Sequence, residues 1–94
     1  MARAVWEGTV LAESDDTIEV DGYTYFPRAA VKWDLLKKTE HQTTCSWKGV
    51  ASYWDIAVGA KRNPNAAWSY LAPKPAAERV TERVSFWRGV AIER

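Results

Sequence analysis

The dipeptide Asp21-Gly22 most constrains the fold, because it stands between two short runs of alternating apolar side chains. A two-residue hairpin loop of type I′ needs a positive φ at both loop positions, which Asp-Gly accommodates readily. Counting outward from the loop pairs Val20 with Tyr23. The next pair on that face is Ile18 with Tyr25, so four apolar side chains share one side. The sequence therefore predicts an antiparallel hairpin here.

The rest of the chain has similar short alternations. They predict strands at 4–12, 50–58, 66–70, 84–87 and 90–92. Apolar residues spaced by four predict a helix over 28–37 and a helical turn over 76–83, while 39–42 and 59–65 are predicted as polar connections. Short antiparallel strands with one or two small helices indicate a mainly β domain, either a small barrel or two packed sheets.

Length and charge limit the class of protein. With 94 residues, the chain is predicted to form a single domain over 1–94. It carries 13 basic and 12 acidic side chains, so no strong field favours a phosphate backbone or an anionic membrane. We therefore expect neither nucleic acid nor a membrane as a partner. No apolar signal core or span is found.

The cysteine content points to the compartment and argues against a metal. The single cysteine, Cys45, has no partner for an internal disulfide, which fits a reducing, cytoplasmic location. Zinc sites built on Cys-x-x-Cys need more thiolates than this chain has. We expect no metal and no cofactor.

The segment 43–55 is the strongest candidate for a site, because one strand-like run contains Cys45, a lysine, a glycine and three aromatic residues. The chain also has six tryptophans, more than so small a core requires. Aromatic side chains with polar tips line pockets, stack on planar ligands and hold cations. The candidate ligand-binding residues are Trp6, Trp47, Lys48, Gly49, Tyr53, Trp54, Trp68 and Tyr70.

These residues predict an aromatic pocket for a small, planar or partly cationic molecule of unknown identity. Lys48 and the tyrosine hydroxyls would hold the polar end of the ligand, and Gly49 would mark a bulge or a close backbone approach. The alternative for the tryptophans is ordinary core packing. Trp33 and Trp87 are expected in packing or oligomer contacts.

Two other classes of function stay open. In the first, Cys45 is a catalytic nucleophile, assisted either by His41, four residues earlier, as its base or by Lys48. Since Cys45 and Lys48 are three apart, only a bulge or turn near Gly49 would bring them together. The alternative for Cys45 is a small buried hydrophobe. In the second class, exposed tryptophans form a homodimer or partner surface.

Several uncommon residues also recur in a family-like order. They are Val5-Trp6-Glu7-Gly8, Leu11-Ala12-Glu13-Ser14, Tyr25-Phe26-Pro27, Cys45-Ser46-Trp47-Lys48-Gly49-Val50-Ala51-Ser52-Tyr53, Ala66-Ala67-Trp68-Ser69-Tyr70, Pro73 and Phe86-Trp87. From about Val5 to Ile92 the chain resembles the bacterial family called domain of unknown function 427. That family often has proline where this chain has Ser46.

The resemblance implies a β-tent, in which two antiparallel sheets pack at a steep angle, as in methionine-R-sulfoxide reductases and the ligand-binding domain of cereblon. Relatives with this fold often hold a zinc with four cysteines, which this chain lacks. The cereblon-type domain holds its ligand in a tryptophan cage, for which Trp6, Trp47, Trp54, Trp68 and Trp87 are candidates. The family also carries a nucleotidyltransferase-like label, but such chemistry needs converging carboxylates, and the adjacent Asp15 and Asp16 point apart.

Overall fold

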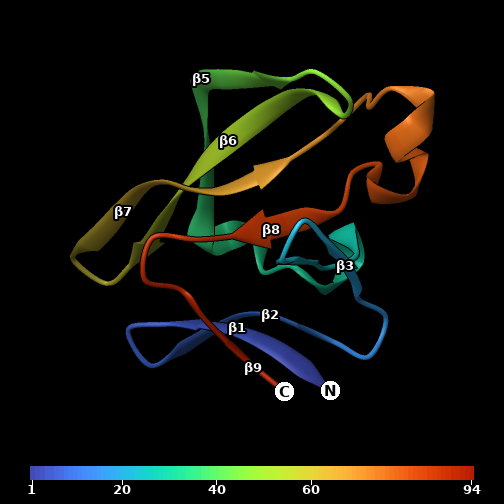
Figure 1. The fold of residues 1–94 in the computed structure, drawn as a ribbon. Coiled ribbons are helices and arrows are strands. Elements are labelled where there is room, and N and C mark those ends of the chain that lie inside the picture. The colour runs from blue at the N-terminus through green and yellow to red at the C-terminus, as the bar shows by residue number, and fades with distance from the viewer.

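The computed structural model describes residues 1–94 and is mainly β (Figure 1). The strands are β1 (Ala2–Trp6), β2 (Thr9–Ser14), β3 (Ile18–Val20), β4 (Tyr23–Tyr25), β5 (Leu36–Cys45), β6 (Gly49–Val58), β7 (Lys61–Ser69), β8 (Val84–Phe86) and β9 (Ala91–Glu93). Three short 3₁₀ helices are present, η1 (Arg28–Ala30), η2 (Trp33–Leu35) and η3 (Pro75–Val80). None of them has the length and apolar character needed to cross a membrane.

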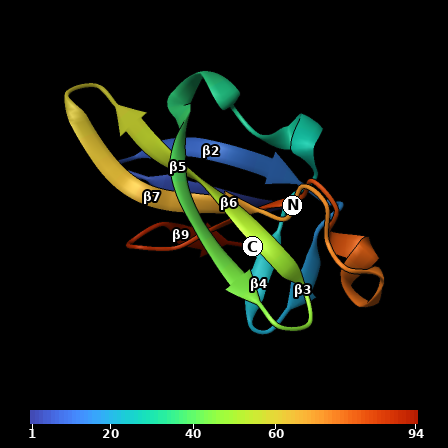
Figure 2. The same ribbon diagram turned by 90° about the horizontal axis from the view of Figure 1, so that it is seen from above.

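The strands form three antiparallel sheets. The largest has the order β5-β6-β7-β8, the second has the order β2-β1-β9, and β3 pairs only with β4. Seen from above, β6 and β7 lie over β1 and β2 (Figure 2). The mainly β, antiparallel architecture predicted from the alternation is therefore confirmed.

The predicted hairpin is confirmed in its register. Val20 pairs with Tyr23 and Ile18 with Tyr25. Asp21 and Gly22 have φ values of 54° and 83°, as a type I′ loop requires. The prediction succeeded because loop geometry and side-chain alternation are both local properties.

The single strand predicted over 4–12 is wrong. Glu7 and Gly8 have φ values of 49° and 72° and form a tight turn. The chain reverses there, so Trp6 pairs with Thr9 and β1 forms a hairpin with β2. A register shift between Ala4 and Val5 leaves Leu11 on β2 without a partner, so that Ala4 pairs with Ala12.

The helix predicted over 28–37 is also wrong. Only η1 and η2 form, and Val31 between them bridges to Ala12 on β2. Leu36 already belongs to β5 and pairs with Ile56. Strand pairing thus overrides the helical spacing in this segment.

Both predicted connections lie largely within strands. Residues 39–42 belong to β5, where a register shift between Lys38 and Gln42 accommodates them. Of 59–65, only Gly59 and Ala60 form a turn, and β7 begins at Lys61. Pro64 lies inside β7, beside a register shift in its pairing with β6.

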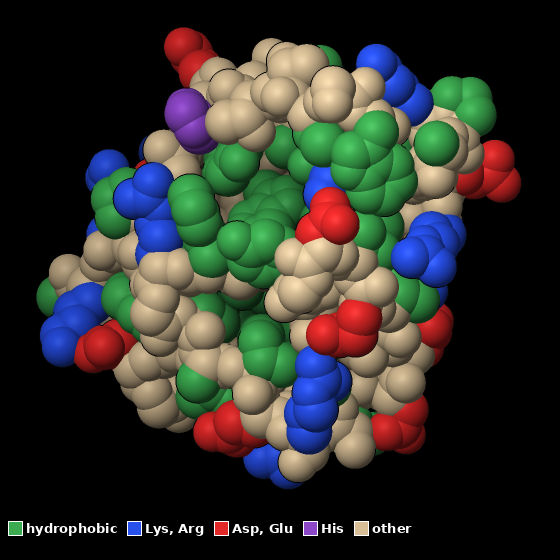
Figure 3. Space-filling view, viewed as in Figure 1, with side chains coloured by type: hydrophobic (Ala, Val, Ile, Leu, Met, Phe, Trp, Pro, Cys, Tyr) green, Lys and Arg blue, Asp and Glu red, His purple; other side chains and the backbone are tan.

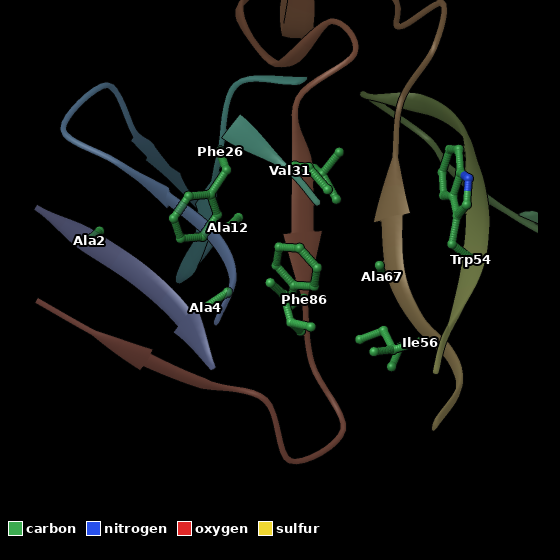
Figure 4. Close-up of a cluster of buried hydrophobic side chains, with 12 residues drawn as sticks. Ala2, Ala4, Ala12, Phe26, Val31, Trp54, Ile56, Ala67 and Phe86 are labelled. Carbon is green, nitrogen blue, oxygen red and sulfur yellow. The ribbon is translucent and has the colours of Figure 1, made fainter. Parts of the chain in front are cut away.

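The large sheet separates two apolar cores, which explains why 51–56 on β6 are all buried. The first core lies between this sheet and β2-β1-β9, and Figure 4 shows Phe26 and Phe86 within it. These two rings meet at 5.9 Å, and Phe26 is fully buried. Each such side chain contributes about 1.5 to 3 kcal/mol on burial. The second core lies on the opposite face.

Candidate functional site

A pocket of about 170 Å³ opens on the face of the second core. Figure 3 shows hydrophobic side chains gathered around a hollow on this side of the molecule, next to basic and acidic groups. The lining residues are Tyr23, Tyr25, Lys48, Tyr53, Trp68, Tyr70 and Trp87. Six of the seven are aromatic.

Trp68 on β7 is the centre of the aromatic wall. Tyr53 on β6 is its direct cross-strand partner, and the rings lie 6.4 Å apart. Tyr23 from the β3-β4 hairpin meets Trp68 edge to face at 4.8 Å. Trp87 meets it edge to face at 5.7 Å. Because edge-to-face packing is a favourable arrangement, these contacts hold the wall in place without a ligand.

The ring of Trp87 is further held through its polar edge. Its Nε1 donates to the carbonyl of Asn65 at 2.7 Å, and its backbone amide donates to the carbonyl of Ala66. Arg88 lies over the outer part of the ring at 4.6 Å. Trp87 is therefore a fixed part of the pocket, rather than a mobile cover.

Lys48 provides the only charge in the lining. Its side chain is 8% exposed, and its Nζ donates to Oδ2 of Asp21 at 2.8 Å, whose own side chain is 53% exposed. Nζ also lies 5.6 Å from the ring centre of Tyr70 and 5.2 Å from that of Trp47. Burial, the largest influence, acts to lower the pKa of Lys48. The hydrogen bond to Asp21 and the negative charge of its carboxylate raise the pKa above its usual value, so the side chain stays protonated.

The turn that carries Lys48 is clamped by Lys74. The backbone amide of Lys74 donates to the carbonyl of Lys48 at 2.9 Å, and its Nζ donates to the carbonyl of Ser46 at 2.7 Å. Gly49, which follows, has a φ of 109° and lies against the backbone of Pro73 and Lys74. That conformation suits only glycine, so the β5-β6 turn has one fixed shape.

Four tyrosines line the pocket, and the hydroxyls of the three buried ones differ in their hydrogen bonds. Tyr53 is bonded to the Thr43 hydroxyl at 2.9 Å. Tyr25 accepts a hydrogen bond from Trp68 Nε1 at 3.2 Å and has no acceptor for its own proton. Tyr70 has no hydrogen-bond partner within the protein, but its hydroxyl is not sealed off, because Tyr70 lines the pocket and the one fully buried side-chain oxygen without a partner is Ser69 Oγ.

Burial keeps the two hydroxyls that lack acceptors in their protonated form. It raises the pKa of Tyr70 to about 12, against the opposing effect of Lys48. It also raises the pKa of Tyr25, where the Trp68 hydrogen bond and Lys48 act in the opposite direction. At neutral pH both side chains therefore remain hydrogen-bond donors.

The predicted ligand-binding residues divide between the two faces of the large sheet. Lys48, Tyr53, Trp68 and Tyr70 line the pocket, and Gly49 shapes the turn beside it. Trp54 and Trp6 pack in or against the first core, on the opposite face. Trp47 is 40% exposed at the turn and contacts the pocket only through Lys48.

Cys45 and His41 are not brought together. Both lie on β5, which is extended between them, so four residues separate them by roughly 13 Å. His41 is exposed and packs on Tyr53 at 4.7 Å. Cys45 is half-buried against the second core. The turn does bring Lys48 near it: the backbone amides of Lys48 and Trp47 are the main cause of a lowered Cys45 pKa.

Sequence reasoning did not assign Tyr23 and Tyr25 to the pocket. It expected Trp87 in packing or oligomer contacts, and only the family resemblance made Trp87 a cage candidate. The hairpin register had already put both tyrosines on one apolar face. The hairpin pattern does not predict which sheet this apolar face packs against, because that packing depends on contacts between residues distant in sequence. Trp87 follows β8, so its position depends on the pairing of β8 with β7.

No three or more His, Cys, Asp or Glu side chains cluster in a way that would hold a metal ion. Comparison with known families gives one result: the model described as Domain of unknown function (DUF427) matches residues 1–93. The chain belongs to this family, which confirms the resemblance seen in its sequence. No curated protein matches the chain.

Proposed function

We propose that this member of the DUF427 family binds a small, planar, single-ring molecule in the pocket centred on Trp68. The ring of the ligand packs against Trp68, Tyr23 and Trp87, and its polar end meets Lys48 and the tyrosine hydroxyls. The observation that carries this proposal is a hollow lined by six aromatic side chains and one buried lysine in a 94-residue domain. Concave apolar sites with a few convergent polar groups are typical ligand sites.

The volume of the pocket sets the size of the ligand. A cavity of roughly 150 Å³ admits benzene, and ordinary drug-sized ligands need about 300 Å³ or more. At about 170 Å³, the pocket suits one ring with one polar substituent. A nucleotide exceeds this volume.

The β-tent arrangement is part of the same proposal. It is supported by the two antiparallel sheets β5-β6-β7-β8 and β2-β1-β9 and by the family membership. In this arrangement the pocket lies on the outer face of the larger sheet, under the β3-β4 hairpin.

A panel of single-ring compounds tests the proposal, using tryptophan fluorescence and melting temperature as readouts. The panel contains phenol, benzamide, benzoate, benzamidine and succinimide. At least one is expected to shift both readouts in a saturable manner. Tyr23→Ala, at the rim of the pocket, is expected to weaken the binding, whereas Val50→Ala, an exposed position outside the lining, leaves it unchanged. A panel in which no compound shifts either readout contradicts the proposal.

Thiol chemistry at Cys45 is a second candidate function, favoured by one observation. The turn amides that lower the pKa of Cys45 are the kind of donors that stabilise a thiolate. In this function Cys45 acts as a nucleophile beside the pocket, with Lys48 as the nearby cation. A thiol that resists alkylation in the folded protein would exclude it.

A further inference from the structure

Hydrogen-bond donors exceed acceptors in the pocket. The Lys48 ammonium has three N–H groups, and the protein provides an acceptor for one of them, Oδ2 of Asp21. The side chain is nearly buried and lines the pocket, so the other N–H groups depend for acceptors on whatever fills the pocket. A buried donor without an acceptor is costly, and a ligand that supplies acceptors recovers that cost.

The hydroxyls of Tyr25 and Tyr70 add two more donors without acceptors in the same lining. The hydroxyl of Tyr53, the other buried tyrosine of the lining, is already hydrogen-bonded to the hydroxyl of Thr43. Tyr23, the fourth tyrosine, is exposed. The Asp21 carboxylate lies outside the lining and is half-exposed. The lining thus presents a cation and two O–H donors to whatever enters the pocket.

We propose that the ligand is a small aromatic carboxylate. This inference rests on the proposed function and adds the charge of the ligand. The two carboxylate oxygens accept hydrogen bonds from Lys48 Nζ and from the Tyr25 and Tyr70 hydroxyls. The ring lies against Trp68 and Trp87.

A cationic ligand is the main alternative, because tyrosine and tryptophan faces also attract cations. In this pocket that attraction is already used by the protein itself, since Lys48 Nζ lies over Tyr70 and Trp47. A second cation would meet the buried ammonium at close range, with little water to screen the repulsion. The carboxylate is therefore favoured over an amine or amidine of the same shape.

Three probes of nearly equal size test the charge directly on the unmodified protein. They are benzoate, benzamide and benzamidine, titrated by tryptophan fluorescence or calorimetry. Benzoate is expected to bind at least about 10-fold more tightly than benzamide, because hydrogen bonds to charged groups exceed neutral ones. Benzamidine is expected to bind least. Tighter binding of benzamide or benzamidine than of benzoate would overturn the inference but leave the proposed pocket standing.

Variants then identify the groups that recognise the carboxylate. Lys48→Met is expected to weaken benzoate about 10- to 100-fold and to leave benzamide within about 2-fold. Tyr70→Phe is expected to weaken benzoate about 3- to 10-fold. The matched control is Lys61→Met, which removes an exposed lysine paired with Glu7 outside the pocket and is expected to change neither probe. Benzoate affinity unaffected by Lys48→Met, in a variant that still melts cooperatively, would contradict the assignment.

Discussion

Substitutions in the Lys48–Asp21 ion pair are expected to change the stability of the protein and its affinity for benzoate in opposite directions. Asp21→Asn leaves the buried ammonium of Lys48 without its carboxylate, while asparagine still tolerates the positive φ of 54° at this position. The Coulomb attraction at 2.8 Å is about 6 kcal/mol at an effective dielectric constant of about 20, which is an upper bound.

Asp21 is 53% exposed, so solvent screening reduces that figure considerably. We expect a net loss of about 2 kcal/mol, within the range for hydrogen bonds to charged groups. For a domain of this length, the melting temperature then falls by about 8 to 16 °C.

Lys48→Met acts on the other member of the pair. It removes a nearly buried charge but keeps an apolar stem of similar length, and the remaining carboxylate is solvated. The melting temperature is therefore expected to stay the same or rise. Benzoate affinity should increase in Asp21→Asn, because the Asp21 carboxylate no longer competes with benzoate for Lys48. It should fall about 10- to 100-fold in Lys48→Met.

The assay is thermal unfolding by circular dichroism, together with a benzoate titration of each variant. Glu7→Gln and Lys61→Met serve as the control pair. Their side chains form an ion pair at 2.6 Å, but Lys61 is 69% exposed where Lys48 is 8% exposed, so neither melting temperature should change measurably. If Lys48→Met lowers the melting temperature as much as Asp21→Asn does, Lys48 is a structural residue and the reasoning fails.

Three further predictions concern pH, the core and the thiol. Because burial raises the pKa of Tyr70 to about 12, the unfolded chain ionises first. Stability should therefore fall as the pH rises from about 10 to about 12, and Tyr70→Phe should make this loss smaller in urea unfolding. Phe26→Ala should cost about 3 to 5 kcal/mol in the same assay, because the ring is fully buried against Phe86, and a loss below about 1 kcal/mol would contradict the described core. The pKa of the Cys45 thiol should lie below the ordinary thiol range when the alkylation rate is followed against pH. Ser46→Pro leaves the backbone amides of Trp47 and Lys48 in place, so the pKa of Cys45 should stay lowered in this variant.

The sequence predicted what depends on neighbouring residues. The β3-β4 hairpin follows from Asp21-Gly22 and the alternation around it, and its register was correct. The segment 28–37 shows where local patterns fail to predict structure. Its apolar residues have helical spacing, but Val31 bridges to Ala12 and Leu36 pairs with Ile56. Neither partner is close in sequence.

The candidate site shows the same division. Lys48, Tyr53, Trp68 and Tyr70 were singled out from residue type, and all four line the pocket. Residue type did not distinguish Trp54 from Trp68, because both lie on buried strands and differ only in the face they occupy. Trp68 pairs with Tyr53, the neighbour of Trp54 on β6, so strand alternation puts Trp54 and Trp68 on opposite faces. That pairing joins residues that are distant in sequence, so the sequence pattern of either strand alone does not give it.

A crystal structure of the protein grown with benzoate tests whether the pocket binds an aromatic carboxylate. We expect the benzoate ring against Trp68 and Trp87, with a carboxylate oxygen about 2.8 Å from Lys48 Nζ. A pocket closed by its own side chains in those crystals, or benzoate bound only elsewhere at saturating concentration, would contradict it.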